Sequence, residues 1–555
     1  MSRTSLSFLR PYLYRASAPA KPEYARAYVS IQRRLAQTVA AENFTGPHDV
    51  EKQKRLEQLK RVKPLGDYHP RLVYSTGAES LPLRDFHAKY ESIQETNPDV
   101  VSVFGRVRSV RLLGSKLMFL DIERDTQRLQ VMVELKKLTA RDRLEENFKS
   151  FKKVARIGDW VSIKGNPMRT STGQLSILAA EVPQVLAPCL HHLPEKVDDA
   201  ETLARRPHIH SLTSDEPGDI LRLRALIYDY IRTYFIQSGF LEVETPFFDV
   251  NAGGAIARPF ETVANELSNM SIRLRIAPEL NLKRLIVGGQ DKIFEIGRSF
   301  RNEGVDNSHN PEFTTCEFYE VGATLPSVIA RTEQLLHGLH TAIESLRSTY
   351  FPSLTAPEGV DFSAPFAQLP FIPTIEQASG RKLPDLSSPL ASEEVLKMFK
   401  DLNIDIPPNS TLPRLLDTLA EHYIEPLCHN PTFITHHPEA LSPLSKSFVD
   451  PTTNQRVASR VELFINSREY VNAYEEENSP FEQRRKFMQQ LEFHPEGEAA
   501  IDESYLEALE WGMPPTGGWG CGLDRLVMLF ASKKRIADVL PFGTLRNVVS
   551  IAKHK

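Results

Sequence analysis

Cysteine is scarce in this chain of 555 residues, and no two of its four cysteines form a Cys-x-x-Cys pair. They are Cys189, Cys316, Cys428 and Cys521. This spacing argues against a zinc knuckle and against a disulfide framework, so we expect reduced thiols and no structural metal. Long apolar runs are also missing, and the early run Leu6–Leu9 is too short for the core of a signal peptide. The sequence therefore predicts neither secretion nor a membrane span.

A strong charge of one sign is absent as well, because the formal net charge is only -4. If nucleic acid is a partner, a local basic surface must bind it. No G-x-G-x-x-G or G-x-x-x-x-G-K-[ST] sequence occurs, which disfavours Rossmann and P-loop folds. The length exceeds what one hydrophobic core holds and predicts two or three domains, one of them large enough for a deep substrate cleft.

The first residues have a composition of their own, with repeated arginines, several serines and no acidic residue before Glu23. This composition is typical of a mitochondrial transit peptide, which we place at residues 1–41, and it predicts a location in the mitochondrial matrix. The alternative is a disordered basic arm that touches RNA, since the same charges serve that purpose. A polar, charge-rich extension follows over residues 42–98.

Short stretches of alternating apolar and polar residues then appear, as expected for amphipathic strands. They cover residues 100–107, 116–122, 128–134, 159–165 and 174–182, with a helical insert near 140–151. Five strands with a helix between the third and fourth predict an OB-type β-barrel at residues 99–190. Such barrels commonly bind oligonucleotides on a strand face. Phe119 and Gln130 lie where that face is expected, with Arg111 near the phosphates, although each one alone is more often core or solvated surface.

A polar linker at residues 191–217 leads to the last predicted domain, residues 218–555. A long helix over residues 220–238 is followed by a strand and a proline, and beyond them strands and helices mix without regular alternation. This pattern predicts an α+β fold in which helices flank an antiparallel sheet. Residues 352–430 are rich in proline and charged helices and are interpreted as an insertion.

The run from Phe300 to Tyr319 combines cationic, anionic and aromatic side chains around a polar turn. A guanidinium can fork onto a phosphate, and an aromatic ring can lie against a base, so Arg301 and Phe313 are suited to a nucleotide such as ATP. Taken alone, this pairing is more often a surface charge beside a core aromatic. The remainder of the chain favours the nucleotide.

Three segments in order resemble the signature motifs of class II aminoacyl-tRNA synthetases: residues 239–246 resemble motif 1, 300–319 motif 2 and 518–526 motif 3. The subclass with an N-terminal OB domain contains the lysine, aspartate and asparagine enzymes. Residues 253–260, 275–280, 442–446 and 462–469 are similar to lysyl-tRNA synthetases. The resemblance extends from about residue 64 to residue 542. It implies a homodimeric ligase that activates L-lysine with ATP and transfers it to tRNA(Lys), here for mitochondrial translation.

The resemblance also implies roles for individual residues. Arg301 bridges the substrate carboxylate and the α-phosphate, and Arg525 holds the γ-phosphate; these two are the predicted catalytic residues. The other predicted ATP contacts are Glu303, His309, Asn310 and Phe313. The predicted lysine-binding residues are Gly253, Glu279, Tyr319, Asn472, Tyr474 and Glu476. Glu462 and Glu469 bind Mg²⁺ on the ATP phosphates, and Arg111, Phe119 and Gln130 read the anticodon.

Physical reasoning agrees with lysine as the substrate, because its distal ammonium needs buried acceptors whereas aspartate would need cations. An uncharged analogue would leave Glu476 unpaired, at a cost of about 2 to 5 kcal/mol. One alternative is an aspartyl- or asparaginyl-type ligase, which the Gly-Gly-Ala loop at residues 253–255 and Glu476 discriminate from a lysine enzyme. The other is a non-enzymatic RNA-binding or signalling paralogue, which should have lost Arg301, Arg525 or the metal carboxylates, and all of these are present. The sequence departs from the family pattern at Trp519, at Ala537 and in the run Glu475–Glu477, which puts the fine geometry of the ATP site in doubt.

Overall fold

The computed structural model describes residues 47–71, 79–139, 143–194, 197, 199, 203, 205–250, 257–267, 270–492 and 501–553. The expected transit peptide and Gly253 lie outside these residues. The chain divides into two compact units, one ending at Pro194 and the other beginning at Glu195, and each is described by itself. No helix in the described ranges is both long and apolar enough to cross a membrane.

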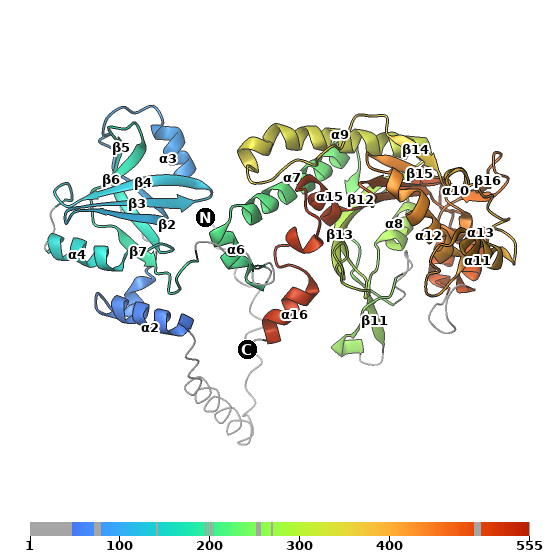
Figure 1. Ribbon diagram of the computed structural model, residues 1–555, viewed down its shortest axis with the longest axis horizontal. Coiled ribbons are helices and arrows are strands. Elements are labelled where there is room, and N and C mark those ends of the chain that lie inside the picture. The colour runs from blue at the N-terminus through green and yellow to red at the C-terminus, as the bar shows by residue number, and fades with distance from the viewer. Residues whose placement is uncertain are drawn as a thin grey trace, which may run out of the picture. The chain divides into compact units, whose positions relative to one another are not determined.

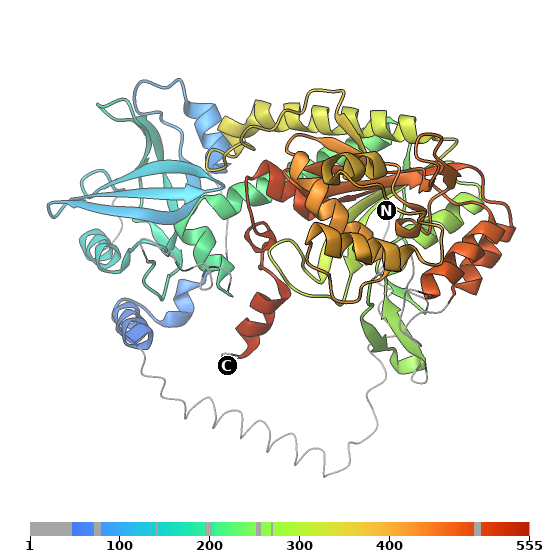
Figure 2. The same ribbon diagram turned by 45° about the vertical axis from the view of Figure 1, so that its right-hand side comes forward.

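The N-terminal unit is built around a seven-stranded sheet with the order β1-β2-β3-β4-β6-β5-β7, which closes through pairing of β2 with β5 (Figure 2). Its strands are β1 (Glu79–Ser80), β2 (Val101–Leu113), β3 (Leu117–Arg124), β4 (Gln127–Glu134), β5 (Trp160–Arg169), β6 (Leu175–Ala179) and β7 (Gln184–Ala187). Its helices are α2 (Pro47–Lys60), η2 (Leu65–Tyr68), α3 (Leu83–Tyr90) and α4 (Leu144–Val154). The expected OB barrel, with its helix between the third and fourth long strands, is confirmed.

Helix α2 belongs to this unit because a buried ion pair joins it to the barrel. Arg55 and Asp159 are 2% and 0% exposed, and Arg55 Nη2 lies 2.8 Å from Asp159 Oδ2. Arg55 Nη1 also donates to the Val154 carbonyl at the end of α4. Part of the extension that the sequence places before the barrel is therefore an integral piece of the barrel's packing.

The C-terminal unit contains an eight-stranded sheet with the order β14-β15-β18-β19-β20-β13-β12-β8. Pairing is antiparallel from β15 to β12, and only the two edge pairs are parallel. The strands are β8 (Leu241–Glu242), β12 (Lys292–Phe300), β13 (Glu312–Val321), β14 (Ala367–Pro370), β15 (Thr432–Thr435), β18 (Arg460–Ile465), β19 (Arg468–Glu475) and β20 (Thr516–Gly522). The predicted α+β class is confirmed.

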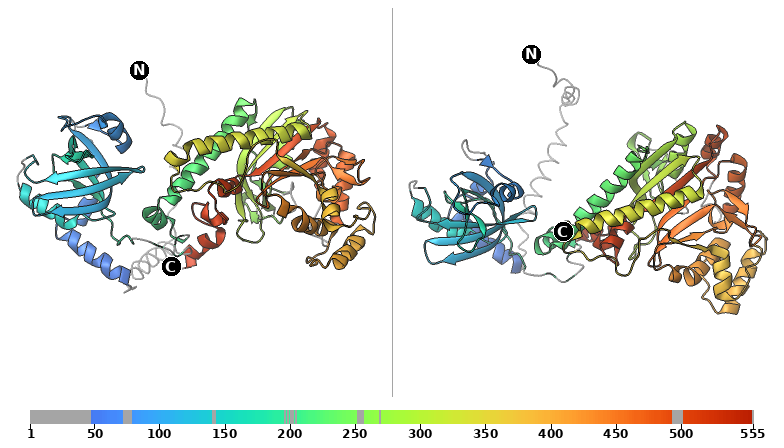
Figure 3. Two further views of the ribbon diagram at one scale, coloured as in Figure 1. Left: turned by 45° about the horizontal axis from the view of Figure 1, so that its top comes forward. Right: turned by 90° about the horizontal axis from the view of Figure 1, so that it is seen from above.

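Helices and short strands surround this sheet (Figures 1 and 3). The helices are α6 (Pro207–Thr213), α7 (Glu216–Gln237), η3 (Asn265–Leu267), α8 (Glu279–Val287), α9 (Leu325–Tyr350), α10 (Phe371–Ser379), α11 (Ala391–Leu402), α12 (Leu412–Tyr423), η4 (Glu425–Leu427), η5 (Glu439–Leu441), α13 (Pro480–Leu491), α14 (Glu503–Glu510), α15 (Leu523–Phe530), η6 (Ile536–Asp538) and α16 (Leu545–Lys553). The short strands are β9 (Phe248–Asp249), β10 (Glu261–Val263), β11 (Ser271–Leu274), β16 (Ser447–Val449) and β17 (Arg456–Ala458).

One face of the large sheet packs on the long helices α7 and α9, which lie side by side in Figures 1 and 3. Phe318, Trp519 and Val471 belong to that core. The Trp519 ring stacks on Phe318, with centroids 5.3 Å apart, and its Nε1 donates to Thr332 Oγ1 at 3.0 Å. Because side chains alternate along a strand, this tryptophan lies on the face opposite Glu317 and Tyr319. Its departure from the family pattern is accommodated in the core.

Candidate active site

The hairpin of β12 and β13 carries the residues predicted to contact ATP. Its strands pair without a register shift from Lys292 opposite Glu320 to Phe300 opposite Glu312. Arg301 follows β12 directly, and its guanidinium carbon lies 5.2 Å from the centroid of the Phe313 ring. Arg301 Nε donates to the Ile276 carbonyl at 3.4 Å. An arginine and an aromatic ring are thus brought together where the sequence predicts phosphate and adenine.

The loop of this hairpin reaches the helix that follows the glycine-rich strand β20. Arg525 lies on α15 and contacts two side chains. Its Nη2 is 3.0 Å from His309 Nε2, and its Nη1 is 3.2 Å from Glu469 Oε2. His309 Nδ1 in turn lies 2.8 Å from Asp306 Oδ2. Slight burial opposes the shift, but hydrogen bonds from the Ser308 amide and from His309 lower the pKa of Asp306 to about 2. Two side chains predicted to contact ATP, Arg525 and His309, therefore already have carboxylate partners.

Two other residues predicted to contact ATP are placed differently. Glu303 is exposed at the turn of the loop. Both polar atoms of the Asn310 side chain are hydrogen-bonded. Its Nδ2 donates to the Glu312 carbonyl at 2.7 Å, and its Oδ1 accepts from the Leu545 backbone amide at 3.0 Å. Asn310 therefore tethers the start of α16, and its side chain could reach a nucleotide only by giving up these bonds.

The hairpin of β18 and β19 carries the carboxylates predicted to bind Mg²⁺. Its two-residue turn, Asn466–Ser467, has φ values of 51° and 55°, as a tight hairpin turn requires. A register shift after Leu463 brings Glu469 opposite Phe464, whereas Glu462 pairs with Asn472. This irregularity and the turn together bring two residues that are seven apart in sequence onto one hairpin.

Glu462 is held by an arginine and a histidine. Its carboxylate is bound by Arg460 Nη2, and its Oε2 lies 3.0 Å from His437 Nε2. Burial alone would raise the pKa of Glu462, but Arg460 and His437 lower it to about 2. Arg460 Nε also donates to Asn472 Oδ1 at 2.9 Å, so Asn472 supports this cluster. No sequence pattern identifies His437 or Arg460 as site residues, because only the fold brings them to Glu462.

Carboxylates and tyrosines gather beside α8 at the other end of the site. Tyr474 donates to Glu279 Oε1 at 2.5 Å, and Lys283 Nζ lies 2.6 Å from the same oxygen. Lys283 is also ion-paired with Glu476. Glu476 is fully buried, and a Cβ at Gly518 would fall only 1.7 Å from its Oε1. Glycine at position 518 is therefore what leaves room for this carboxylate against β20.

Glu317 is a further buried carboxylate in this cluster, and the sequence analysis did not select it. It lies on β13 two residues before Tyr319, whose hydroxyl donates to Glu317 Oε2 at 3.2 Å. Burial raises the pKa of Glu317 to about 8, and the charge of Glu279 adds to the shift. The period-2 alternation of a strand could have identified it, because Tyr319 is a predicted lysine-binding residue and residues two apart on a strand share a face.

The run Glu475–Glu477 divides its three carboxylates among three environments. Glu475 Oε1 accepts from the Leu325 amide at the start of α9 at 2.9 Å. Glu476 is paired with the buried Lys283, and Glu477 Oε2 pairs with the buried Lys486 at 2.8 Å. The extra carboxylates are therefore satisfied away from Glu476, and the local pairing that the sequence left uncertain is resolved.

The three residues predicted to read an anticodon lie on adjacent strands of the barrel. Arg111 on β2 is opposite Phe119 on β3, and its guanidinium carbon is 5.9 Å from the ring centroid. Gln130 on β4 is opposite Asp121 and accepts from Ser176 Oγ at 3.1 Å. Gln130 is only 8% exposed, so little of its side chain is accessible to a base.

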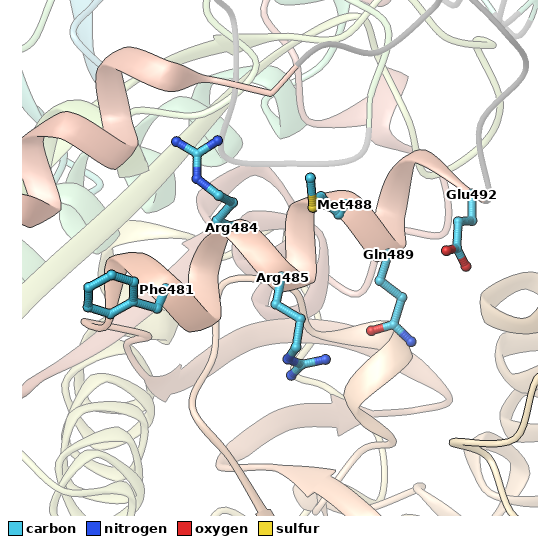
Figure 4. Close-up of a pocket in the computed structure, with 6 residues that line it drawn as sticks. All are labelled: Phe481, Arg484, Arg485, Met488, Gln489 and Glu492. Atoms are coloured by element: carbon cyan, nitrogen blue, oxygen red, sulfur yellow. The ribbon is translucent and has the colours of Figure 1, made fainter.

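A separate hollow runs along α13 in the C-terminal unit and includes none of the predicted site residues (Figure 4). It is lined by Phe481, Arg484, Arg485, Met488, Gln489 and Glu492. Within the described ranges, no group of three or more His, Cys, Asp or Glu side chains is arranged to hold a metal ion. A metal at Glu462 and Glu469 would thus need further oxygen ligands, such as those of a bound nucleotide.

Comparison with known families agrees with this geometry. The model of a family described as tRNA synthetases class II (D, K and N) matches residues 199–546. The model of the OB-fold nucleic acid binding domain matches residues 101–184.

Individual relatives are similar over most of their length. A lysine–tRNA ligase named cla4 from Cladosporium cladosporioides is 38% identical over 483 residues, which is 84% of this chain and 80% of the relative. The mitochondrial lysine–tRNA ligase of Schizosaccharomyces pombe is 37% identical over 457 residues, 80% of this chain and 84% of the relative. A probable cytoplasmic lysine–tRNA ligase of Encephalitozoon cuniculi is 40% identical over 476 residues, 82% and 89% of the two chains.

Proposed function

This chain belongs to the class II tRNA synthetases as a lysine–tRNA ligase, and from that premise we propose how its own residues carry out the reaction. ATP and L-lysine give lysyl-adenylate and pyrophosphate, and the lysyl group then passes to the 3′ adenosine of tRNA(Lys). The observation that carries the proposal is the buried cluster of Glu279, Glu317 and Glu476, since an ammonium substrate needs such acceptors. An aspartate or asparagine enzyme would need cations at this position.

In the first step the lysine carboxylate attacks the α-phosphorus, and the protein positions the reactants and neutralises charge. Arg301 is proposed to bridge the carboxylate and the α-phosphate, with Phe313 under adenine. Arg525 and His309 take the γ-phosphate and exchange their partners Glu469 and Asp306 for phosphate oxygens. No side-chain nucleophile is needed, because the carboxylate of the substrate is the attacking group.

The residues present fit a Mg²⁺ ion that arrives with ATP. Mg²⁺ is usually bound by one or two carboxylates together with substrate phosphates. Glu462 suits this role because Arg460 and His437 keep its carboxylate ionised, and Glu469 lies on the same hairpin. When bound, the ion neutralises phosphate charge. The proposed ligands are Glu462 and Glu469.

At the lysine end, Glu279 and the backbone of Gly253 are proposed to bind the α-ammonium, and Tyr474 to line the aliphatic stem. Tyr319, Glu476 and Glu317 take the ε-ammonium. Asn472 is proposed to contact the substrate carboxylate, although its Oδ1 already accepts from Arg460, so that contact would use its amide nitrogen.

The second step needs the tRNA to be held by its anticodon. We assign residues 99–190 to anticodon binding and residues 218–555 to catalysis, with an insertion at 352–430. Stacking on an aromatic side chain contributes about 1 to 3 kcal/mol per base. Phe119→Ala should therefore raise the KM for tRNA about tenfold in aminoacylation and leave ATP–pyrophosphate exchange unchanged.

We propose that the enzyme is a homodimer that acts in the mitochondrial matrix. Exposed apolar side chains at and after the motif 1 strand, including Leu241 and Phe248 at 54% and 61% exposure, support a subunit interface. The mitochondrial relative and the basic composition of residues 1–41 support the location. Sedimentation of the wild type beside Phe248→Asp tests the dimer. A reporter fused to residues 1–41 tests import.

The reaction itself is tested by ATP–pyrophosphate exchange with lysine, ornithine, aspartate and asparagine. Exchange that depends on lysine, with ornithine as the only weak substitute, is the expected result. Exchange with aspartate or asparagine would point to the other members of the subclass. No exchange with any of the four would indicate a paralogue without the activity.

A further inference from the structure

We infer that Lys283 is a built-in ammonium of the lysine pocket: a positioning residue that holds Glu279 and Glu476 as the acceptors of the substrate. This inference rests on the proposed function and concerns a residue that the motifs do not assign. The geometry carries it. Lys283 is completely buried on α8, and its Nζ lies 2.6 Å from Glu279 Oε1 and in an ion pair with Glu476.

The charges of the pocket balance only when Lys283 is counted. Three buried carboxylates meet there, from Glu279, Glu317 and Glu476, and Lys283 supplies one ammonium. A lysine substrate supplies two more, at its α and ε positions. Burial raises the pKa of Glu317 to about 8 in the ligand-free protein, so we infer that Glu317 ionises when the substrate binds. Three carboxylates then face three ammonium groups, which satisfies the requirement that buried charges be paired.

Glu476 has capacity left for the substrate. Its Oε1 has no hydrogen-bond partner in the described part of the chain, whereas its Oε2 is in contact with Lys283 Nζ. Lys283 is fixed by its own burial and by Glu279, and its Nζ lies 5.6 and 5.9 Å from the ring centroids of Tyr474 and Tyr505. The geometry therefore lets an incoming ammonium share Glu476 with Lys283 rather than displace it.

Removing the charge of Lys283 should change the titration of Glu476. The titratable and charged groups that face Glu476 come from four elements: Glu279 and Lys283 on α8, Glu317 and Tyr319 on β13, Tyr474 on β19, and Tyr505 on α14. Burial raises the pKa of Glu476, and Lys283 opposes that shift. Without Lys283, Glu476 should hold its proton to higher pH and bind an ammonium poorly at neutral pH.

The test is Lys283→Met in the full chain, with Lys486→Met as the matched control. Lys486 is also buried and paired with a glutamate, Glu477 Oε2 at 2.8 Å, but this pair lies outside the pocket. In ATP–pyrophosphate exchange, Lys283→Met should raise the KM for lysine about 100-fold and leave the KM for ATP within about threefold. The raised KM should fall as pH increases. Lys486→Met should leave both KM values near wild type.

The inference is overturned if Lys283→Met leaves the KM for lysine unchanged, or if Lys283→Met raises the KM for ATP as much as the KM for lysine. If Lys283→Met does not fold, Lys283→Gln carries the same test, because it removes the charge and keeps a polar group. Adding propylammonium chloride should partly restore exchange in a Lys283→Ala variant but should only inhibit the wild type. A wild type that shows no lysine-dependent exchange would instead refute the proposed function and can be distinguished from these outcomes.

Discussion

At the proposed lysine end of the site, Glu317 and Glu476 are 8% and 0% exposed, whereas Asp306 and His309 at the phosphate end have more than half of each side chain accessible. The buried carboxylates cannot be satisfied by water, so only a ligand with matching charges is accepted. The exposed pairs are weak and readily exchange one partner for another. Under the proposed roles, buried carboxylates select the amino acid, while ATP is bound by surface groups that exchange their partners.

The largest expected effect comes from Arg301, which we place between the two ends. Arg301→Ala should lower the rate of ATP–pyrophosphate exchange by about two to three orders of magnitude, because it removes a charge that stabilises the transition state. Arg298→Ala is the matched control, since Arg298 lies on β12 three residues before Arg301 and its guanidinium is 3.5 Å from Glu312. Equal losses in both variants would contradict a specific role for Arg301.

Glu317→Gln tests the buried end. The KM for lysine should rise about 10- to 100-fold, because a charged hydrogen bond to the ammonium becomes a neutral one. The KM for ATP should stay constant. Glu312→Gln, on the exposed start of the same strand, should change neither value. A rise in the KM for ATP of the same size would remove the distinction between the two ends.

The raised pKa of Glu317 predicts that the free energy of unfolding depends on pH. In the folded, ligand-free protein the pKa of Glu317 is raised to about 8, so the unfolded chain loses this proton first. The free energy of unfolding should therefore fall as pH rises from about 4.5 to 8, with a contribution of about 1.4 kcal/mol per pH unit. Glu317→Gln should lack this contribution and become more stable than the wild type near pH 8. Urea unfolding at several pH values measures the difference, and identical pH profiles would argue against a buried, protonated Glu317.

His309→Ala tests the exposed end. It removes one of the two proposed γ-phosphate contacts, so the KM for ATP should rise about tenfold and the KM for lysine should not change. Steady-state exchange at saturating lysine measures this, and the free energy of unfolding should match that of the wild type because His309 is exposed.

The smallest effect is expected for Asp306→Asn. Asp306 accepts from the Ser308 and His309 amides and pairs with the His309 ring. Its loss should change the KM for ATP by about threefold, as expected for an exposed pair. Asp385→Asn, a similar exposed turn that accepts from the Ser387 amide, should have no effect. A tenfold or larger change in the KM for ATP would mean that this exposed pair contributes as much as the buried contacts do.

Much of the architecture could be predicted because it depends on local patterns. The alternating strands at residues 100–134 form β2, β3 and β4, and the helix expected over residues 220–238 is α7, Glu216–Gln237. The order of the motifs indicated the class II fold, which the comparisons confirm. The roles assigned to individual site residues remain predictions, because the structure places the side chains without substrates.

What could not be predicted depends on contacts between distant parts of the chain. No sequence motif includes Lys283, and only the fold places it against Glu476. Asn310 is a predicted ATP contact, but its side chain tethers the start of α16. Trp519 departs from the family pattern near the ATP site, yet strand alternation places its side chain in the core on the other face of the sheet. In each case a contact between distant segments decided the role.

The most direct test of the account is the KM for both substrates in Glu476→Gln, with the adjacent Glu475→Gln as its control. Glu475 points to the start of α9 and Glu476 into the pocket. The account predicts that Glu476→Gln raises the KM for lysine by about 30-fold or more, with the KM for ATP unchanged, and that Glu475→Gln alters neither. Equal effects of the two neighbours, or an unchanged KM for lysine in Glu476→Gln, would contradict selection by buried carboxylates.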